Sequence, residues 1–66
     1  MEIGDRIRID EMTGVVVALI SDGKFATSYP AELWAYLKVG VLVETDQAGL
    51  IYYPNLDGIE VDKISD

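Results

Sequence analysis

Carboxylates are the main groups through which this 66-residue chain could do chemistry, because it contains no histidine and no cysteine. Those two residue types supply the commonest general base, the commonest metal ligands and the most reactive nucleophile at neutral pH. Asp57, Glu60 and Asp62 are close enough in sequence to act as acid and base or to bind a hard cation. With Gly58 at the sixth position of a calcium loop, however, a tyrosine and an isoleucine fall where acidic ligands are required. We expect no metal site here.

Hydroxyls and lysine amines are the other groups that could react. The serines and threonines fall mostly in segments of turn composition, where hydroxyls bond to backbone groups. The lysines stand among twelve acidic residues and are more simply surface counter-charges. No glycine-rich phosphate loop is present, and we interpret the isolated glycines as turn residues: Gly14, Gly23, Gly40, Gly49 and Gly58. The sequence predicts a protein that is not an enzyme and has no cofactor.

The aromatic residues give the clearest signal of binding. In one interpretation they line a shallow groove that accepts a peptide, since tyrosine and tryptophan offer much contact area at small entropic cost. The candidate interaction surface is then Tyr29, Trp34, Tyr36 and Tyr53. In the other, Trp34 shares an apolar helical face with Leu33 and Leu37 and closes one end of the core. A chain this small has few large side chains to spare for its core, which favours the second interpretation for Trp34.

The elements that would position these residues begin with a β-hairpin. Residues 3–10 alternate isoleucine with charged residues, which predicts a strand with one face in water. Residues 15–21 are apolar on both faces and rich in β-branched side chains, as in a central strand. Between them, residues 11–14 have the composition of a turn. Asp22-Gly23 favours a tight turn that leads into a short third strand at residues 25–27.

One helix is expected near residues 30–38. Pro30 suits a first helical position, apolar residues follow at helical spacing, and Gly40 can end the segment. Strand patterns then return at residues 39–45, 50–53 and 59–64, with a glycine-containing turn at residues 46–49. Closely spaced short strands favour closure, because closure removes exposed edges. The predicted fold class is mainly β, a single-domain barrel over residues 1–66 with five to six antiparallel strands.

Composition narrows the classes of function. A chain of this length buries only about 60% of its unfolded surface, which leaves room for one core. Half of the residues are hydrophobic and the formal charge is −7, so the chain is too apolar for disorder and too acidic for routine contact with phosphates. Some apolar surface should remain exposed, to be covered by an unknown protein partner or by a second copy in a homodimer. No apolar run approaches the roughly 18 residues of a membrane-spanning helix, and no signal peptide is evident, so we expect a cytoplasmic location.

The strand "GDRIRI", a short acidic link, "TGVVVALI" and a helical turn between later strands resemble the small barrels of the Src-homology-3-like class. The resemblance is to architecture, because the Ala-Leu-Tyr-Asp-Tyr stretch and the paired tryptophans of the peptide-binding domains are absent. The segment from Tyr29 to Pro54 is also similar to short bacterial proteins that pair a helical tryptophan with a strand ending in "GLI-aromatic-Tyr-Pro". Those proteins have no assigned activity, so this resemblance implies none.

Three hypotheses of function follow. The first is a non-catalytic module that works by protein contact through the candidate aromatic surface. The second is an acidic inhibitor or immunity-type protein that mimics nucleic acid, which would be favoured if five acidic residues cluster on one face: Glu44, Asp46, Asp57, Glu60 and Asp62. The third is nucleic-acid binding through a positive stripe formed by Arg6 and Arg8, which five basic residues against twelve acidic ones make the weakest of the three.

Overall fold

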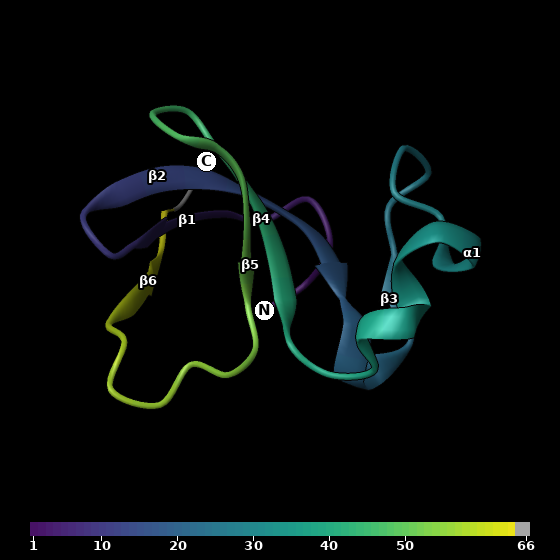
Figure 1. The fold of residues 1–66 in the computed structure, drawn as a ribbon. Helices are drawn as coiled ribbons and strands as arrows, with labels where there is room; N and C mark the ends of the chain where they lie inside the picture. The colour runs from purple at the N-terminus through teal and green to yellow at the C-terminus, as the bar shows by residue number, and fades with distance from the viewer. Residues whose placement is uncertain (65–66) are drawn as a thin grey trace.

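The computed structural model describes residues 1–64, which form one antiparallel sheet and one short helical segment (Figure 1). The strands of this part of the chain are β1 Arg6–Ile9, β2 Met12–Leu19, β3 Lys24–Phe25, β4 Val41–Thr45, β5 Gly49–Tyr53 and β6 Val61–Lys63. They are hydrogen-bonded in the order β5-β4-β2-β1-β6, and β3 pairs with β2 outside this path. The mainly β fold class is confirmed, with β2 central as its two apolar faces predict.

The sheet is open in its strand pairing. β5 and β6 stand at the two ends of the hydrogen-bonded path, and the pairing therefore does not show the closed barrel that the sequence predicts. The connection between these two strands is long and curves around one side of the molecule (Figure 1). Leu56 and Ile59 from this connection pack against the buried side chains of the sheet.

The first hairpin turns two residues earlier than predicted. Ile9 pairs with Met12, so Asp10 and Glu11 alone make the turn, with φ of 52° and 66°. Gly14, interpreted above as a turn residue, is instead buried in β2. A Cβ atom on it would lie 2.5 Å from the carbonyl oxygen of Glu44, so Gly14 is required by the close approach of β2 to β4.

Buried side chains form two clusters, where one core was expected. Leu42 and Val43 are neighbours on β4 and therefore point to opposite faces of the sheet. The inner cluster contains Ile7, Ile9, Val16, Leu19, Val43 and Tyr53, and the outer cluster contains Val17, Ala18, Ile20 and Leu42. The register of β2 against β4 shifts between Val16 and Ala18. This bulge changes the phase of the alternation, which is how β2 supplies both clusters.

The predicted helix is two short turns of different kinds, α1 at Ala31–Trp34 and η2 at Ala35–Leu37. Pro30 is not the first helical residue but the extended residue before it, with φ −68° and ψ 150°. We call residues 30–39 the arm. It lies beside β3 at one end of the molecule (Figure 1). No helix among residues 1–64 has the length and apolar character needed to cross a membrane.

The other two turns carry glycine at left-handed backbone angles. Gly49 has φ 73° in the turn between β4 and β5, as the sequence predicts. The turn before β3 is longer than the expected two residues, because Ile20–Asp22 forms a 3₁₀ turn, η1, that ends at Gly23 with φ 70°. Leu19 then pairs with Lys24, so β3 begins one residue earlier than expected.

Candidate functional site

The inner side of the arm is packed on the outer cluster of the sheet. Trp34 and Leu37 are partly buried against this cluster, and the Tyr29 ring lies 5.9 Å from that of Trp34 at an interplanar angle of 50°. The Tyr29 hydroxyl donates a hydrogen bond of 2.6 Å to Oε2 of Glu44. Trp34 therefore does not close the end of a barrel. It covers the face of β2 and β4 that points away from the inner cluster.

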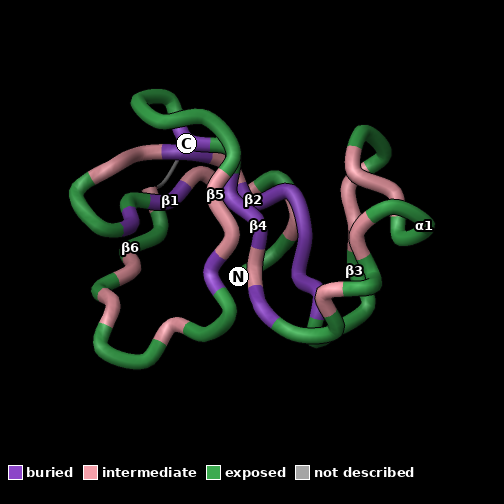
Figure 2. Tube along the Cα trace, in the orientation of Figure 1, coloured by how far each residue is buried: buried purple, intermediate pink, exposed green. Residues whose placement is uncertain are grey.

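The opposite side of the arm exposes large apolar side chains. Leu33 is 65% exposed, Tyr36 71% and Val39 52%, and most of the arm is exposed in Figure 2. The prediction that Leu33 shares the buried face of Trp34 is wrong. In a 3₁₀ turn residues three apart lie above one another, so η2 places Leu37 beneath Trp34 and brings Tyr36 to the side of Leu33.

The end of the arm is held to the sheet by polar contacts. The Tyr52 hydroxyl donates to the carbonyl of Val39 at 2.6 Å. The Gly40 N–H donates to Oγ of Ser21 at 3.0 Å, and the Gly40 carbonyl accepts from the Ile20 N–H at 2.9 Å. Gly40 has φ 106°, and a Cβ there would overlap the Tyr53 carbonyl oxygen. The exposed side chains of the arm are thus carried on an anchored backbone.

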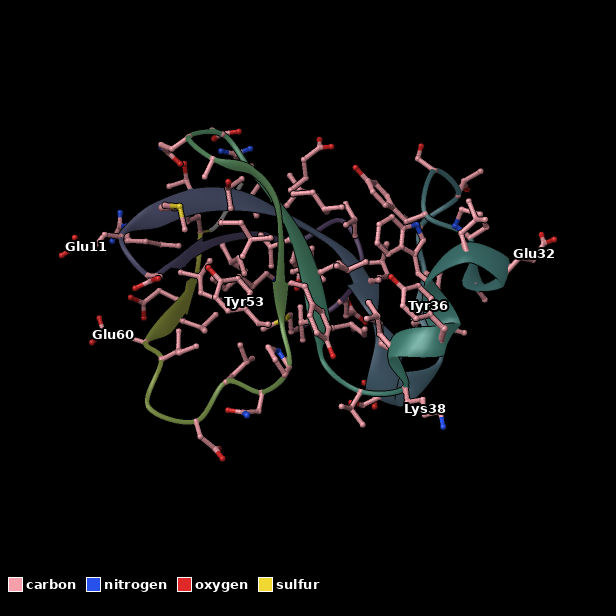
Figure 3. The ribbon with its side chains drawn as sticks, viewed as in Figure 1. Glu11, Glu32, Tyr36, Lys38, Tyr53 and Glu60 are labelled. Carbon is pink, nitrogen blue, oxygen red and sulfur yellow. The ribbon has the colours of Figure 1, made fainter. Side chains whose placement is uncertain are left out.

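Tyr53 does not belong to this surface. It is only 7% exposed and packs in the inner cluster, well inside the molecule in Figure 3. Its hydroxyl is buried and has no hydrogen-bond partner among the described residues. Burial, and to a smaller degree the charge of Asp10, raises the pKa of Tyr53 above its ordinary value. The sequence-based surface therefore separates: Tyr29, Trp34 and Tyr36 come together and Tyr53 lies elsewhere.

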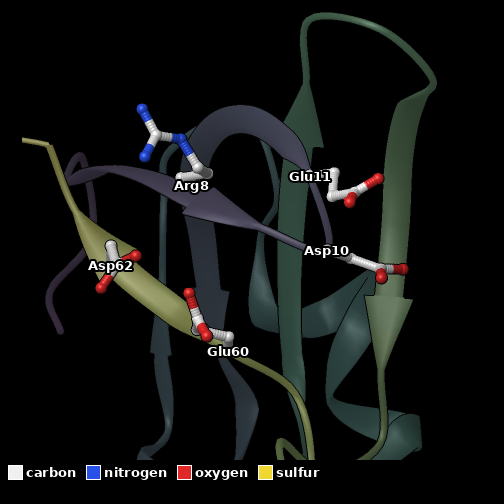
Figure 4. Close-up of a pocket in the computed structure, with 5 residues that line it drawn as sticks. All are labelled: Arg8, Asp10, Glu11, Glu60 and Asp62. Atoms are coloured by element: carbon white, nitrogen blue, oxygen red, sulfur yellow. The ribbon is translucent and has the colours of Figure 1, made fainter.

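A second feature is a pocket of about 310 Å³ where β1 and β6 pair. Its lining is charged and consists of Arg8, Asp10, Glu11, Glu60 and Asp62 (Figure 4). Arg8 lies directly opposite Asp62 in the register of the two strands. No group of three or more acidic residues among residues 1–64 is arranged to hold a metal ion. The pocket is therefore a charged surface concavity in which carboxylates outnumber the single guanidinium.

The two arginines of β1 are both beside carboxylates. Arg6 donates from Nη2 to Oδ2 of Asp46 at 2.9 Å, and the Thr13 hydroxyl donates to the same oxygen at 2.9 Å. The Arg6 bond first, and the Thr13 bond second, hold the pKa of Asp46 below its ordinary value. Arg8 shares the charged pocket with four carboxylates. Of the two arginines of the third hypothesis, Arg6 is thus paired with a carboxylate, and Arg8 lines a pocket in which carboxylates outnumber it.

The five acidic residues of the second hypothesis do not all share one site. Glu60 and Asp62 line the pocket, whereas Glu44 is bonded to Tyr29 and Asp46 to Arg6. Asp57 is exposed in the connection between β5 and β6. The pocket gains Asp10 and Glu11 instead. Nothing in the sequence singled these two out beyond their place in an acidic turn.

Comparisons with protein-family models, with curated proteins and with solved structures give no match to this chain. Two features remain as candidate sites: the exposed side of the arm and the charged pocket at the other end of the molecule. Leu33 and Val39 join Tyr36 on the first of these. The sequence does not indicate Leu33 or Val39 as surface residues, because the helical spacing of Leu33 predicts burial and Val39 falls within a strand pattern.

Proposed function

We propose that this protein is a small non-catalytic binding module that acts through the exposed side of its arm. The observation that carries the proposal is the concentration of apolar surface there. Of the five large hydrophobic residues exposed in the described chain, three lie between residues 33 and 39. Scattered single hydrophobic residues need no explanation, but exposed hydrophobic residues concentrated in one short segment are typical of an interaction site.

The way the arm is held favours binding. Trp34 and Leu37 fix it from below, and the bonds around Gly40 fix its end. A surface that is already ordered loses little conformational entropy when a partner docks. Tyr36 is the expected anchor, since exposed tyrosine contributes large contact area and a polar tip and is enriched among the residues that dominate binding energy.

The proposal includes an architecture and a location. Residues 1–64 form an open sheet around the inner cluster, and Leu56 and Ile59 cover the side between β5 and β6. We propose that this arrangement is a small barrel of the Src-homology-3-like class. In this barrel the connection that carries Leu56 and Ile59 fills the gap between β5 and β6, where hydrogen bonding between these two strands would otherwise close the sheet. We also propose a cytoplasmic site of action, in keeping with a chain that has no cysteine to pair in an oxidising compartment.

A photo-crosslinking experiment tests the function. In one sample a benzophenone amino acid replaces Tyr36. In the control it replaces Leu50, which is another exposed hydrophobic residue and is remote from Tyr36 in the sequence. Both samples are irradiated in a cell extract of the organism from which the protein comes. We expect a discrete crosslinked product from position 36 and none from position 50. The proposal fails if the two positions give the same products, or if Leu33→Ser added to the position-36 sample leaves its product unchanged.

The second candidate function is an acidic inhibitor that mimics nucleic acid. It is favoured by the four carboxylates gathered at the pocket, because electrostatic complementarity can direct such a surface to a basic protein. The test is competition with double-stranded DNA for a basic DNA-binding protein. Displacement by the wild type, lost in Glu60→Gln/Asp62→Asn but kept in Glu32→Gln, would support this candidate. No displacement at low salt would exclude it. We do not propose nucleic-acid binding, since Arg6 is paired with Asp46 and Arg8 shares its pocket with four carboxylates.

A further inference from the structure

The charge of this protein is unevenly distributed between its two ends. Residues 22–43, which include the arm and the last residue of the η1 turn bonded to its end, contain two acidic residues and two basic residues: Asp22, Glu32, Lys24 and Lys38. Their formal charge is zero, so the remaining residues carry the whole −7 of the chain. Figure 3 shows Glu11 and Glu60 at the end of the molecule that lies opposite the arm. The end that carries the arm is therefore far less acidic than the opposite end.

This distribution determines how two copies of the chain can approach each other. Copies that meet through their acidic ends place like charges together, which costs several kcal/mol at an interface. Copies that meet through their arms bring nearly neutral ends together and keep the acidic ends apart. The same arm carries the exposed apolar side chains of Leu33, Tyr36 and Val39. Exposed apolar side chains and weak electrostatic repulsion thus coincide at the arm.

The charges of the arm are also self-complementary. Glu32 and Lys38 are both exposed and lie at opposite ends of the arm (Figure 3), and Leu33 and Tyr36 lie between them in the sequence. A two-fold axis through such a patch brings each charge of one copy onto the opposite charge of the other. Glu32 of one copy then faces Lys38 of the partner subunit, and Lys38 faces the partner subunit's Glu32. Two ion pairs would flank a central apolar contact.

The backbone turns sharply at Lys38. Lys38 has φ 68° and ψ −38°, and the Val39 N–H donates to the Leu37 carbonyl at 2.8 Å. This is a γ-turn, a rare and strained conformation. The turn ends the arm and leaves Lys38 exposed.

We infer that the partner of the arm is a second copy of this chain, and that the two arms pack antiparallel around a two-fold axis with Glu32 and Lys38 paired between copies. The inference rests on the proposed function and names the partner of that same surface. The interface is small, and interfaces that bury less than about 1,200 Å² in total are weak and transient. We therefore expect reversible dimerisation with a dissociation constant on the order of 100 µM.

Sedimentation equilibrium on the full chain, from about 10 µM to about 1 mM, brackets that constant. Glu32→Lys and Lys38→Glu each replace both ion pairs by like-charge contacts. Each should raise the dissociation constant about tenfold or more. Matched controls carry the same charge changes away from the arm, Glu60→Lys and Lys63→Glu, and should change the dissociation constant far less, because salt screens charges that are remote from the interface. Circular dichroism and thermal melting of every variant separate lost dimerisation from lost folding.

Mixing the two arm variants gives the decisive measurement. In an equimolar mixture of Glu32→Lys with Lys38→Glu, one copy carries two lysines and the other two glutamates, so both ion pairs form between unlike copies. The mixture should recover wild-type dimerisation, and so should the double variant Glu32→Lys/Lys38→Glu. A folded wild type that stays monomeric at the highest concentration overturns the inference. Recovery by neither the mixture nor the double variant overturns the antiparallel pairing.

The same data distinguish this inference from the proposed function. A crosslinked product from position 36 with twice the mass of the chain agrees with both. A monomeric wild type whose position 36 still gives a discrete product with another protein refutes the dimer and leaves the binding module standing. A monomeric wild type without any product refutes both.

Discussion

The Tyr29 hydroxyl donates a 2.6 Å hydrogen bond to Oε2 of Glu44, fifteen residues further along the chain. The bond joins the segment that enters the arm to the outward-facing side of β4. Tyr29 also packs against Trp34. The side chain of Tyr29 therefore contacts the arm through Trp34 and the sheet through Glu44. The protonation state of this hydroxyl should therefore affect how well the arm is held.

The first prediction is loss of stability at alkaline pH through Tyr29. The bond to Glu44 first, then burial and the Glu44 charge, raise the pKa of Tyr29 above its ordinary 10.0. A raised folded-state pKa means that the contribution to stability is complete below pH 10.0 and is lost as the pH rises through the folded value. The difference in unfolding free energy between wild type and Tyr29→Phe should thus stay constant from about pH 8 to about pH 9 and shrink as the pH rises above 10.0. Urea unfolding at each pH measures it, and a constant difference contradicts the assignment.

The second prediction is that Tyr53→Phe stabilises the protein by about 1 kcal/mol. The buried hydroxyl of Tyr53 has no hydrogen-bond partner among the described residues, and an unsatisfied buried donor costs roughly 1–3 kcal/mol. Phenylalanine keeps the ring in the inner cluster and removes that cost. The matched control is Tyr52→Phe, which loses the bond to the Val39 carbonyl and should be less stable by about 1 kcal/mol. Equal losses in both variants on urea unfolding would refute the prediction.

The third prediction concerns the turn between β1 and β2. Asp10 and Glu11 both have left-handed backbone angles, the conformation of a two-residue hairpin turn that asparagine followed by glycine adopts with least strain. The double change Asp10→Asn/Glu11→Gly should stabilise the protein by about 1–2 kcal/mol. Glu11→Gln removes the charge and keeps the strain, so it should gain little. A gain by Glu11→Gln equal to that of the double variant would assign the effect to charge.

The fourth prediction is that Gly14, inside a strand, tolerates a methyl group far less than Gly58, in a turn. Gly14→Ala places a Cβ against the backbone of Glu44 and Thr45 and the side chain of Val43, which should cost about 3 kcal/mol or more. Gly58 has φ 75° with nothing within 4 Å, so Gly58→Ala should cost only about 1 kcal/mol, from the backbone angle. Thermal melting compares the two, and similar losses would mean that β2 and β4 can separate locally.

Much of the β structure could be read from local patterns. The alternation of isoleucine with charged residues in β1 identifies a strand with one face in water, and the apolar run of β2 identifies a central strand, because side chains alternate across a pleated sheet. The turn at Gly49 follows from the one residue type that adopts a left-handed angle without cost. These features depend on neighbours in the sequence, so a sequence is sufficient to predict them.

Other features depend on contacts between distant residues. Gly14 is a turn glycine by composition, and only the approach of Glu44 and Thr45 shows why the position must be small. Tyr53 is an aromatic residue beside a proline, and only the pairing of β5 with β4 turns it inward. The pocket unites Asp10 and Glu11 with Glu60 and Asp62 because β6 pairs with β1.

Local sequence patterns are sufficient to establish a small, acidic, mainly β chain with one short helical segment between strands. Which side of that segment is exposed depends on contacts between residues that are distant in the sequence. The bulge in β2 divides the buried residues into two clusters. The change from α-helical to 3₁₀ geometry after Trp34 leaves Leu33 and Tyr36 on the side of the arm that faces away from the sheet. Periodicity predicts which residues share a face. It does not predict which face meets the sheet, because that depends on what the sheet leaves uncovered.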